Sequence, residues 1–186
     1  MNVTTKYISL LDIIDQINIL LETEHYIAAL TLALTIPDKC GKIAYPEMKS
    51  GKERYIKWYD NWCWCYTCSH INNPSASEVE FPDIGGKFIY QLRCAMLHEN
   101  TTKLDYAKVE EKNRTDDFQL EISDSIEDYV VVYSWVLIDG KRLLAIRLID
   151  LCKLICYAAK EYYEGNKEKV DSSNNIQIID ARTLKQ

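Results

Sequence analysis

The chain has 186 residues, of which 47% are hydrophobic, and it carries a formal net charge of -6. This length suffices for one complete core and is short for two, so we predict a single globular domain. The acidic excess excludes a general nucleic-acid coat, which needs clustered lysine and arginine, and any RNA binding must therefore be local.

The N-terminal sequence and the cysteine count indicate the compartment. Asp12 and Asp15 interrupt the first apolar run, so we predict neither a signal peptide nor a membrane span and expect a cytoplasmic protein without a membrane partner. The seven cysteines are an odd number. In a chain without a secretion signal we expect them to be reduced and buried, not joined in a disulfide framework.

The first half of the chain is predicted to be helical. Apolar residues at helical spacing predict a helix over residues 10–34, as one long helix or two in tandem, with a stop before Pro37. A loop containing Gly41, Pro46 and Gly51 follows, and a second helix with an aromatic face runs from about residue 53 to 68. After a polar loop at 72–77, Asp83 is expected to cap a third helix that ends near Asn100.

The second half predicts strands followed by a helix. Phe118, Leu120 and Ile122 alternate with polar residues, and residues 129–138 form a β-branched and aromatic run. The Asp139-Gly140 pair predicts a hairpin turn into a returning strand at 142–147, while the alternative is a helix that begins at Lys141. A helix is predicted over 149–163, and residues 175–181 can add a last strand. The expected fold is therefore mostly α (α+β).

Arg93 and His98 lie five positions apart near the end of the third predicted helix, within Tyr-Gln-Leu-Arg-Cys-Ala-Met-Leu-His-Glu-Asn at 90–100. This pattern in a helical chain resembles the HEPN superfamily, whose members often act as metal-independent RNases in toxin–antitoxin, CRISPR-associated and phage-defence systems. The resemblance covers mainly residues 7–104. It implies one HEPN-like helical bundle over 1–186, with its helical core at about 7–104 and 149–165 and a small antiparallel β elaboration at about 106–148. The family often has a polar residue, commonly Asn, at the position of Cys94.

The chemistry of the pair can be considered without the family. RNA is cleaved when its 2′-hydroxyl attacks the adjacent phosphorus, which requires a base and a stabilising cation. His98 is the predicted base and Arg93 the predicted cation, so we predict no metal and no cofactor. On an ideal α-helix a five-residue step separates two side chains by about 140°. The resemblance implies a solution, a two-fold homodimer in which two motifs line one cleft.

Other functions remain as alternatives. Arg93 can instead form an ion pair with a carboxylate such as Glu99, while His98 interacts with the helix C-terminus. The chain would then be a catalytically silent HEPN-like module that binds a nucleotide or a protein partner, such as an antitoxin. A third hypothesis is a metal-binding regulatory protein built around a cysteine cluster.

That cluster comprises Cys63, Cys65, Cys68 and His70. Four potential zinc ligands within eight residues invite a metal site, but structural zinc sites usually take ligand pairs from separated segments. The interleaved Trp62, Trp64 and Tyr66 favour a buried aromatic helix in which the cysteines are small core residues. We therefore predict no metal site.

A basic stretch with interleaved aromatic residues runs from Lys39 to Tyr59. Its lysines and arginine could follow a phosphate backbone while an exposed aromatic ring stacks on a base. Alternatively, the aromatic residues are core and the lysines form a solvated rim. The predicted RNA-binding residues are Lys52, Arg54 and Lys57, with Lys87 on the third helix, and they matter only if they lie beside His98.

Overall fold

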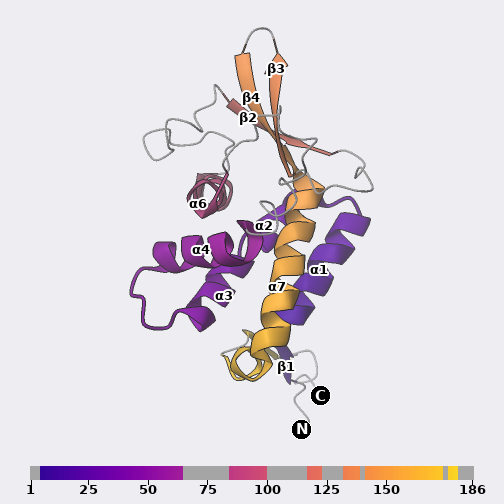
Figure 1. Ribbon diagram of the computed structural model, residues 1–186. Coiled ribbons are helices and arrows are strands. Elements are labelled where there is room, and N and C mark those ends of the chain that lie inside the picture. The colour runs from indigo at the N-terminus through magenta and orange to yellow at the C-terminus, as the bar shows by residue number, and fades with distance from the viewer. Residues whose placement is uncertain are drawn as a thin grey trace.

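A long helix, α7 (Leu148–Asp171), forms the axis of the computed structural model, with α1 (Leu10–Glu22) packed along it (Figure 1). The structure describes residues 5–64, 84–99, 117–122, 132–138, 141–173 and 176–179. The chain is mostly helical with a small β component, as predicted. Within the described residues, no helix combines the length and the hydrophobicity needed to cross a membrane.

The predicted helical run at 10–34 forms two helices in tandem, α1 and α2 (Tyr26–Ala33). A capping box begins α1, because the Ser9 hydroxyl accepts from the Asp12 amide at 3.1 Å and the Asp12 carboxylate accepts from the Ser9 amide at 2.8 Å. Glu24, which has a φ of 60°, lies in the turn between the two helices. A residue in the left-handed region cannot continue a helix, and so the run divides here.

The helical run ends at Ala33, before Pro37 as predicted, but the loop expected immediately after this stop is wrong. A third helix, α3 (Ile36–Ala44), begins there with Pro37 in its first turn. Proline is tolerated at that position because the amide of the first turn has no partner within the helix. Gly41 lies inside α3, where an added Cβ would be 2.8 Å from the Arg54 carbonyl oxygen, so this glycine permits close packing on α4 (Gly51–Tyr59).

The second and third predicted helices both end in wider π-helical turns. After α4 the chain continues as η1 (Asp60–Trp64), and after α6 (Gly86–Cys94) it continues as η3 (Ala95–Glu99). Residues 65–68 of the second prediction, together with Asp83 and Asn100, lie outside the described residues. The N-cap of α6 is Gly85, and the Gly86 amide donates to Asp60 Oδ1 at 2.6 Å. The carboxylate of Asp60, which lies on a different helix, thus provides an acceptor for a backbone amide at the start of α6 that has no partner within that helix.

The predicted hairpin is confirmed. Strands β3 (Tyr133–Ile138) and β4 (Lys141–Arg147) are antiparallel with Ile138 opposite Lys141, so the alternative of a helix at Lys141 is wrong. Strand β2 (Asp117–Glu121) pairs with the other edge of β4 in parallel. The sheet order is β2-β4-β3, so this sheet is mixed and not purely antiparallel as predicted. The hairpin leaves one edge of β4 open, and β2 occupies it.

The C-terminal part is longer and more regular than predicted. Helix α7 extends eight residues past the predicted end at 163, with non-helical backbone angles at Asn166. The predicted last strand is confirmed as β5 (Ile176–Ile179), which pairs antiparallel with β1 (Thr5–Ile8), a strand that the sequence did not indicate. The β1–β5 pair lies at the opposite end of α7 from the β2-β4-β3 sheet (Figure 1).

One cluster of buried apolar residues joins the helices to the β2-β4-β3 sheet. The hydroxyl oxygens of Tyr59 on α4 and Tyr133 on β3 are 2.8 Å apart and share a buried hydrogen bond. Phe88 on α6 and Phe118 on β2 meet edge to face, with their centroids 6.4 Å apart. These contacts fix α4 and α6 against the sheet. The predicted core thiols are present at Cys40, Cys63, Cys152 and Cys156, which are all buried.

Candidate functional site

Arg93 lies on α6 in a close ion pair with Asp38 on α3. Arg93 Nε is 2.6 Å from Asp38 Oδ2, and the two side chains are 19% and 35% exposed. This contact joins a guanidinium group to a carboxylate on a different helix. The sequence suggested Glu99 as an alternative partner, but its side chain is not among those described. Asp38 was missed because it lay in a predicted loop.

Two tyrosine rings flank the Arg93 guanidinium group. Its central carbon is 5.9 Å from the ring centroid of Tyr55 on α4 and 5.8 Å from that of Tyr90 on α6. The two rings meet edge to face, with their centroids 5.3 Å apart. Tyr55 is fully buried, and its hydroxyl has no hydrogen-bond partner among the described residues. Cation–π contacts and the ion pair therefore hold the guanidinium from several sides.

Burial and charge act in opposite directions on the ion pair. Burial raises the pKa of Asp38, and the nearby guanidinium groups of Arg93 and Arg54 offset part of that increase. For Arg93, burial acts to lower the pKa, but the combined effects of Asp38, Tyr55 and Cys94 outweigh it and the pKa is raised. Arg93 is consequently a permanent cation, and a fifth of its side chain remains open to solvent.

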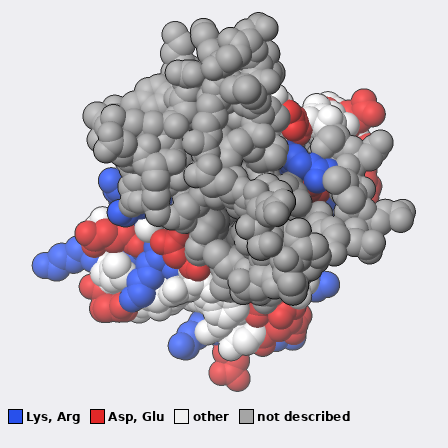
Figure 2. All heavy atoms as spheres, turned by 45° about the horizontal axis from the view of Figure 1, so that its top comes forward, with Lys and Arg blue, Asp and Glu red and all other residues white. Residues whose placement is uncertain are grey.

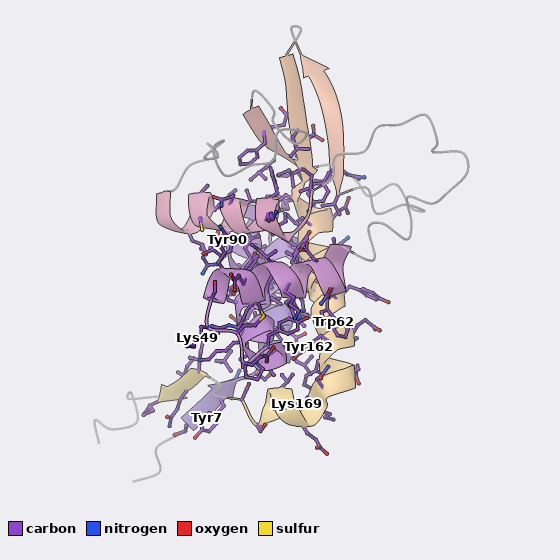
Figure 3. The ribbon with its side chains drawn as sticks, turned by 60° about the vertical axis from the view of Figure 1, so that its left-hand side comes forward. Tyr7, Lys49, Trp62, Tyr90, Tyr162 and Lys169 are labelled. Atoms are coloured by element: carbon purple, nitrogen blue, oxygen red, sulfur yellow. The ribbon has the colours of Figure 1, made fainter. Side chains whose placement is uncertain are left out.

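Two predicted RNA-binding residues lie beside Arg93. The ammonium nitrogen of Lys52 is 5.8 Å from the ring centroid of Tyr90, so Lys52 and Arg93 contact the same ring. Arg54 donates to the Met48 carbonyl and is close enough to lower the pKa of Asp38. We call this group the Arg93 cluster: Asp38, Lys52, Arg54, Tyr55, Tyr90 and Arg93. Figure 3 shows Tyr90 on α6, above the side chains of α4.

The other two predicted RNA-binding residues lie outside the Arg93 cluster. Lys57 sits over the ring of Tyr45, with 4.4 Å between its ammonium nitrogen and the ring centroid. Asn61 donates to the hydroxyl of that tyrosine at 2.8 Å. Lys87 is exposed in the first turn of α6, about 9 Å along the helix from Arg93 at the usual rise per residue. The structure therefore divides the predicted set into two groups.

The backbone at His98 differs from the regular helix that the sequence predicted. His98 lies in η3, and its side chain is not among those described. In a π-helix the hydrogen bonds join residues five apart, which places such residues nearly one above the other. Arg93 lies in α6 and His98 in η3, so the regular α-helical geometry assumed for the five-residue step does not extend over its whole length. The angular argument for a second chain is weakened accordingly.

Charges are interspersed on the described surface. In Figure 2, lysine and arginine side chains alternate with aspartate and glutamate side chains on the face shown. No group of three or more potential metal ligands occurs in the described part of the chain. Cys63 is fully buried at the end of η1, whereas Cys65, Cys68 and His70 lie outside the described residues. The Arg93 cluster is accordingly a local cationic and aromatic site within an acidic protein.

The Arg93 cluster has the components of a phosphate-binding site. Guanidinium and ammonium groups supply charge, and tyrosine rings fix their positions. Comparisons of the chain with protein-family models, with curated proteins and with solved structures find no match. The resemblance to the HEPN superfamily thus depends on the Arg93 and His98 motif and on the helical pattern around it.

Proposed function

We propose that this protein is a metal-independent endoribonuclease in which Arg93 and His98 act on one phosphodiester. The observation that supports the proposal is the Arg93 cluster. Arg93, which stands five residues before His98, contacts the same tyrosine ring as Lys52. A cation that is held in place before substrate binds needs little reorganisation when charge develops on the phosphate.

The proposed reaction uses the 2′-hydroxyl of the RNA as the nucleophile. His98 accepts its proton while the 2′ oxygen forms a bond to phosphorus, and Arg93 stabilises the charge on the phosphate oxygens. The bond from phosphorus to the 5′ oxygen breaks, and this oxygen takes up a proton. The products are a 2′,3′-cyclic phosphate and a free 5′-hydroxyl.

The assembly and the biological role complete this proposal. A homodimer would bring the α6 helices of two chains to one two-fold axis, as in the family that the motif resembles. A toxin or defence role, with a protein partner such as an antitoxin, stays a prediction. Light scattering at micromolar concentration tests the dimer. Cleavage by a strict monomer would contradict the shared cleft and leave the roles of Arg93 and His98 in place.

The decisive experiment is cleavage of a varied RNA panel in the presence of EDTA. We expect a cyclic phosphate or its opened product on the 5′ fragment, and no cleavage of DNA, which lacks the attacking hydroxyl. His98→Ala and Arg93→Ala should each reduce the rate at least ~100-fold. Lys57→Ala is the matched control, because it removes a cation of α4 that lies outside the Arg93 cluster.

A second candidate function is a catalytically silent module that binds a nucleotide or a protein partner. The 2.6 Å ion pair favours it, because Asp38 already gives Arg93 a counter-charge. The same experiment separates the two functions. If the RNA panel is not cleaved, yet nucleotide binding is lost in Arg93→Ala and kept in His98→Ala, the silent module is correct.

A further inference from the structure

The packing of α3 places Asp38 against Arg93. Asp38 lies in the first turn of α3, directly after Pro37, which is buried. Further along α3, an added Cβ at Gly41 would be 2.8 Å from the Arg54 carbonyl oxygen, so α3 and α4 are in close contact. Close packing at these two positions restricts the movement of α3. The Asp38 carboxylate is therefore held at Arg93 by a packed helix and not by a loop.

The carboxylate contacts one particular edge of the guanidinium group. Asp38 Oδ2 is 2.6 Å from Arg93 Nε, and this nitrogen is buried. The Arg93 side chain keeps 19% of its surface exposed, so its exposed atoms are others than Nε. An arginine carries a single N–H group on Nε and the rest on its two Nη nitrogens. A phosphate that approaches from solvent can therefore be bound only through the Nη nitrogens.

Two tyrosine rings restrict the rotation of the same guanidinium group. Its central carbon is 5.9 Å from the ring centroid of Tyr55 and 5.8 Å from that of Tyr90. Tyr55 is fully buried, so its ring cannot move aside without disturbing the core. The ion pair and the two rings together determine which N–H groups of Arg93 face solvent.

We propose that Asp38 is a positioning residue, which holds Arg93 by its Nε edge so that the Nη nitrogens face the phosphate of a bound RNA. This inference rests on the phosphate contact of Arg93 in the proposed function. A guanidinium group that is already oriented loses less conformational freedom when it binds phosphate through two parallel N–H groups. Asp38 thus supports RNA binding, although its charge has the same sign as that of the phosphate.

The charges around Asp38 are compatible with this role. Arg54 and Arg93 both act to lower the pKa of the carboxyl group, against the larger effect of burial. The Lys52 ammonium group lies 5.8 Å from the ring centroid of Tyr90, which Arg93 also contacts. Cations therefore outnumber the single carboxylate within the Arg93 cluster. A phosphate is attracted to the cluster while Asp38 stays in place.

Two substitutions of Asp38 separate positioning from charge. Asp38→Asn and Asp38→Ala both remove the negative charge, but only asparagine keeps a side-chain oxygen that can accept from Arg93. We expect Asp38→Asn to bind single-stranded RNA about threefold to tenfold more tightly than Asp38→Ala, as for the loss of one hydrogen bond. Fluorescence anisotropy in a His98→Ala background with EDTA measures binding without cleavage. Asp38→Leu, of similar size to asparagine, replaces Asp38→Ala if that variant does not fold.

Further variants show whether the difference acts through Arg93. It should disappear in an Arg93→Ala background, where no guanidinium group is left to position. Glu53→Gln and Glu53→Ala are the matched control pair, because Glu53 is an exposed acid in the first turn of α4, and they should bind RNA equally. The Nε–H signal of Arg93 in a proton–nitrogen NMR spectrum is identified by its absence in Arg93→Ala. It should keep its wild-type position more closely in Asp38→Asn than in Asp38→Ala.

Each outcome decides the proposal. Tighter binding by Asp38→Asn than by Asp38→Ala, dependent on Arg93, supports it whether or not the wild-type chain cleaves RNA. Equal binding by the two variants overturns it, even if the wild-type chain cleaves RNA as proposed. If both bind RNA equally and more tightly than wild type, Asp38 is a competing counter-charge. The same difference in the Glu53 pair would show a general effect of side-chain size and overturn it, and a wild-type chain that binds no RNA would overturn it together with the proposed function.

Discussion

The Arg93 cluster and the sheet formed by β1 and β5, here called the β1–β5 arm, reverse the usual distribution of polar and apolar residues. In the cluster, the side chains of Arg93 and Asp38 are largely covered, and Arg93 is held by Asp38, Tyr55 and Tyr90. In the arm, the three isoleucines of β5 are half exposed or more. A partly buried ion pair needs compensation within the fold, and the cluster provides it. In the described part of the chain, the apolar side chains of β5 stay half exposed, without a comparable set of contacts.

The two regions also differ in how the fold supports them. Helices α3, α4 and α6 approach so closely that Gly41 and Gly86 leave no room for a Cβ atom. The Asp60 carboxylate further fixes the start of α6 on the preceding helical segment. The arm is joined to α7 beyond the irregular backbone at Asn166, and Ile8 is the one buried residue among those described in its two strands. Contacts between several helices therefore hold the cationic site in place, whereas the arm is held mainly by the pairing of its own two strands.

The first prediction shortens one apolar side chain in each region, and we expect the largest difference in the free energy of unfolding here. Ile89→Ala on α6 should lower the free energy of unfolding by about 2–5 kcal/mol, because Ile89 is fully buried. Ile178→Ala in the arm should change it by less than about 0.5 kcal/mol at low protein concentration. Denaturant unfolding of both variants measures this. A large loss from Ile178→Ala in the monomer would show that the arm packs within its own chain.

The second prediction concerns the close approach of α6 to α4. In Gly86→Ala the new Cβ would lie 2.6 Å from the Ile56 carbonyl oxygen and 3.0 Å from Asp60 Oδ1. We expect a loss of about 1–3 kcal/mol in unfolding free energy, as for other overpacked sites. Gly165→Ala is the control, because nothing lies within 4 Å of its Cβ position, and it should gain about 0.4–1 kcal/mol. Equal effects would contradict the packing argument.

The sequence predicted the elements whose signals are local. Apolar periodicity indicated the helices, and Asp139-Gly140 with its flanking strands indicated the β3–β4 hairpin. Helix α3 was missed because Pro37 and Gly41 were interpreted as helix breakers. Pro37 instead occupies a first turn, and Gly41 serves a contact with Arg54, thirteen positions away. The parallel pairing of β2 and the pairing of β1 with β5 depend on distant segments, for which no local pattern exists.

The same distinction applies to the site. Arg93, Lys52 and Arg54 could be selected by residue type, and the structure brings them together. Lys57 was selected on equal grounds but lies over Tyr45 instead. The partner Asp38 could not be predicted, because its contact with Arg93 spans 55 positions and crosses from α3 to α6. Whether His98 joins these residues stays a prediction.

The third prediction measures the Asp38 and Arg93 contact itself. A double-mutant cycle with Asp38→Ala, Arg93→Ala and the double variant should give a coupling energy of about 1 kcal/mol. The pair is partly exposed, so the value should exceed that of a surface ion pair only slightly. Arg93→Ala also loses the packing of Arg93 on Tyr55 and Tyr90, and the cycle cancels this contribution because the double variant loses it too. A cycle between Asp38 and Lys57 should give no coupling, and a comparable value there would contradict a specific pair.

The last prediction uses salt, which should act on RNA binding at the Arg93 cluster. Binding of single-stranded RNA should weaken as salt rises, and Lys52→Ala should reduce the slope of log affinity against log salt by about 0.7. Fluorescence anisotropy in a His98→Ala background measures binding without cleavage. Lys57→Ala is the matched control for the slope. If it lowers the slope as much as Lys52→Ala does, RNA follows general surface charge, and the position of Lys52 beside Arg93 carries no functional meaning.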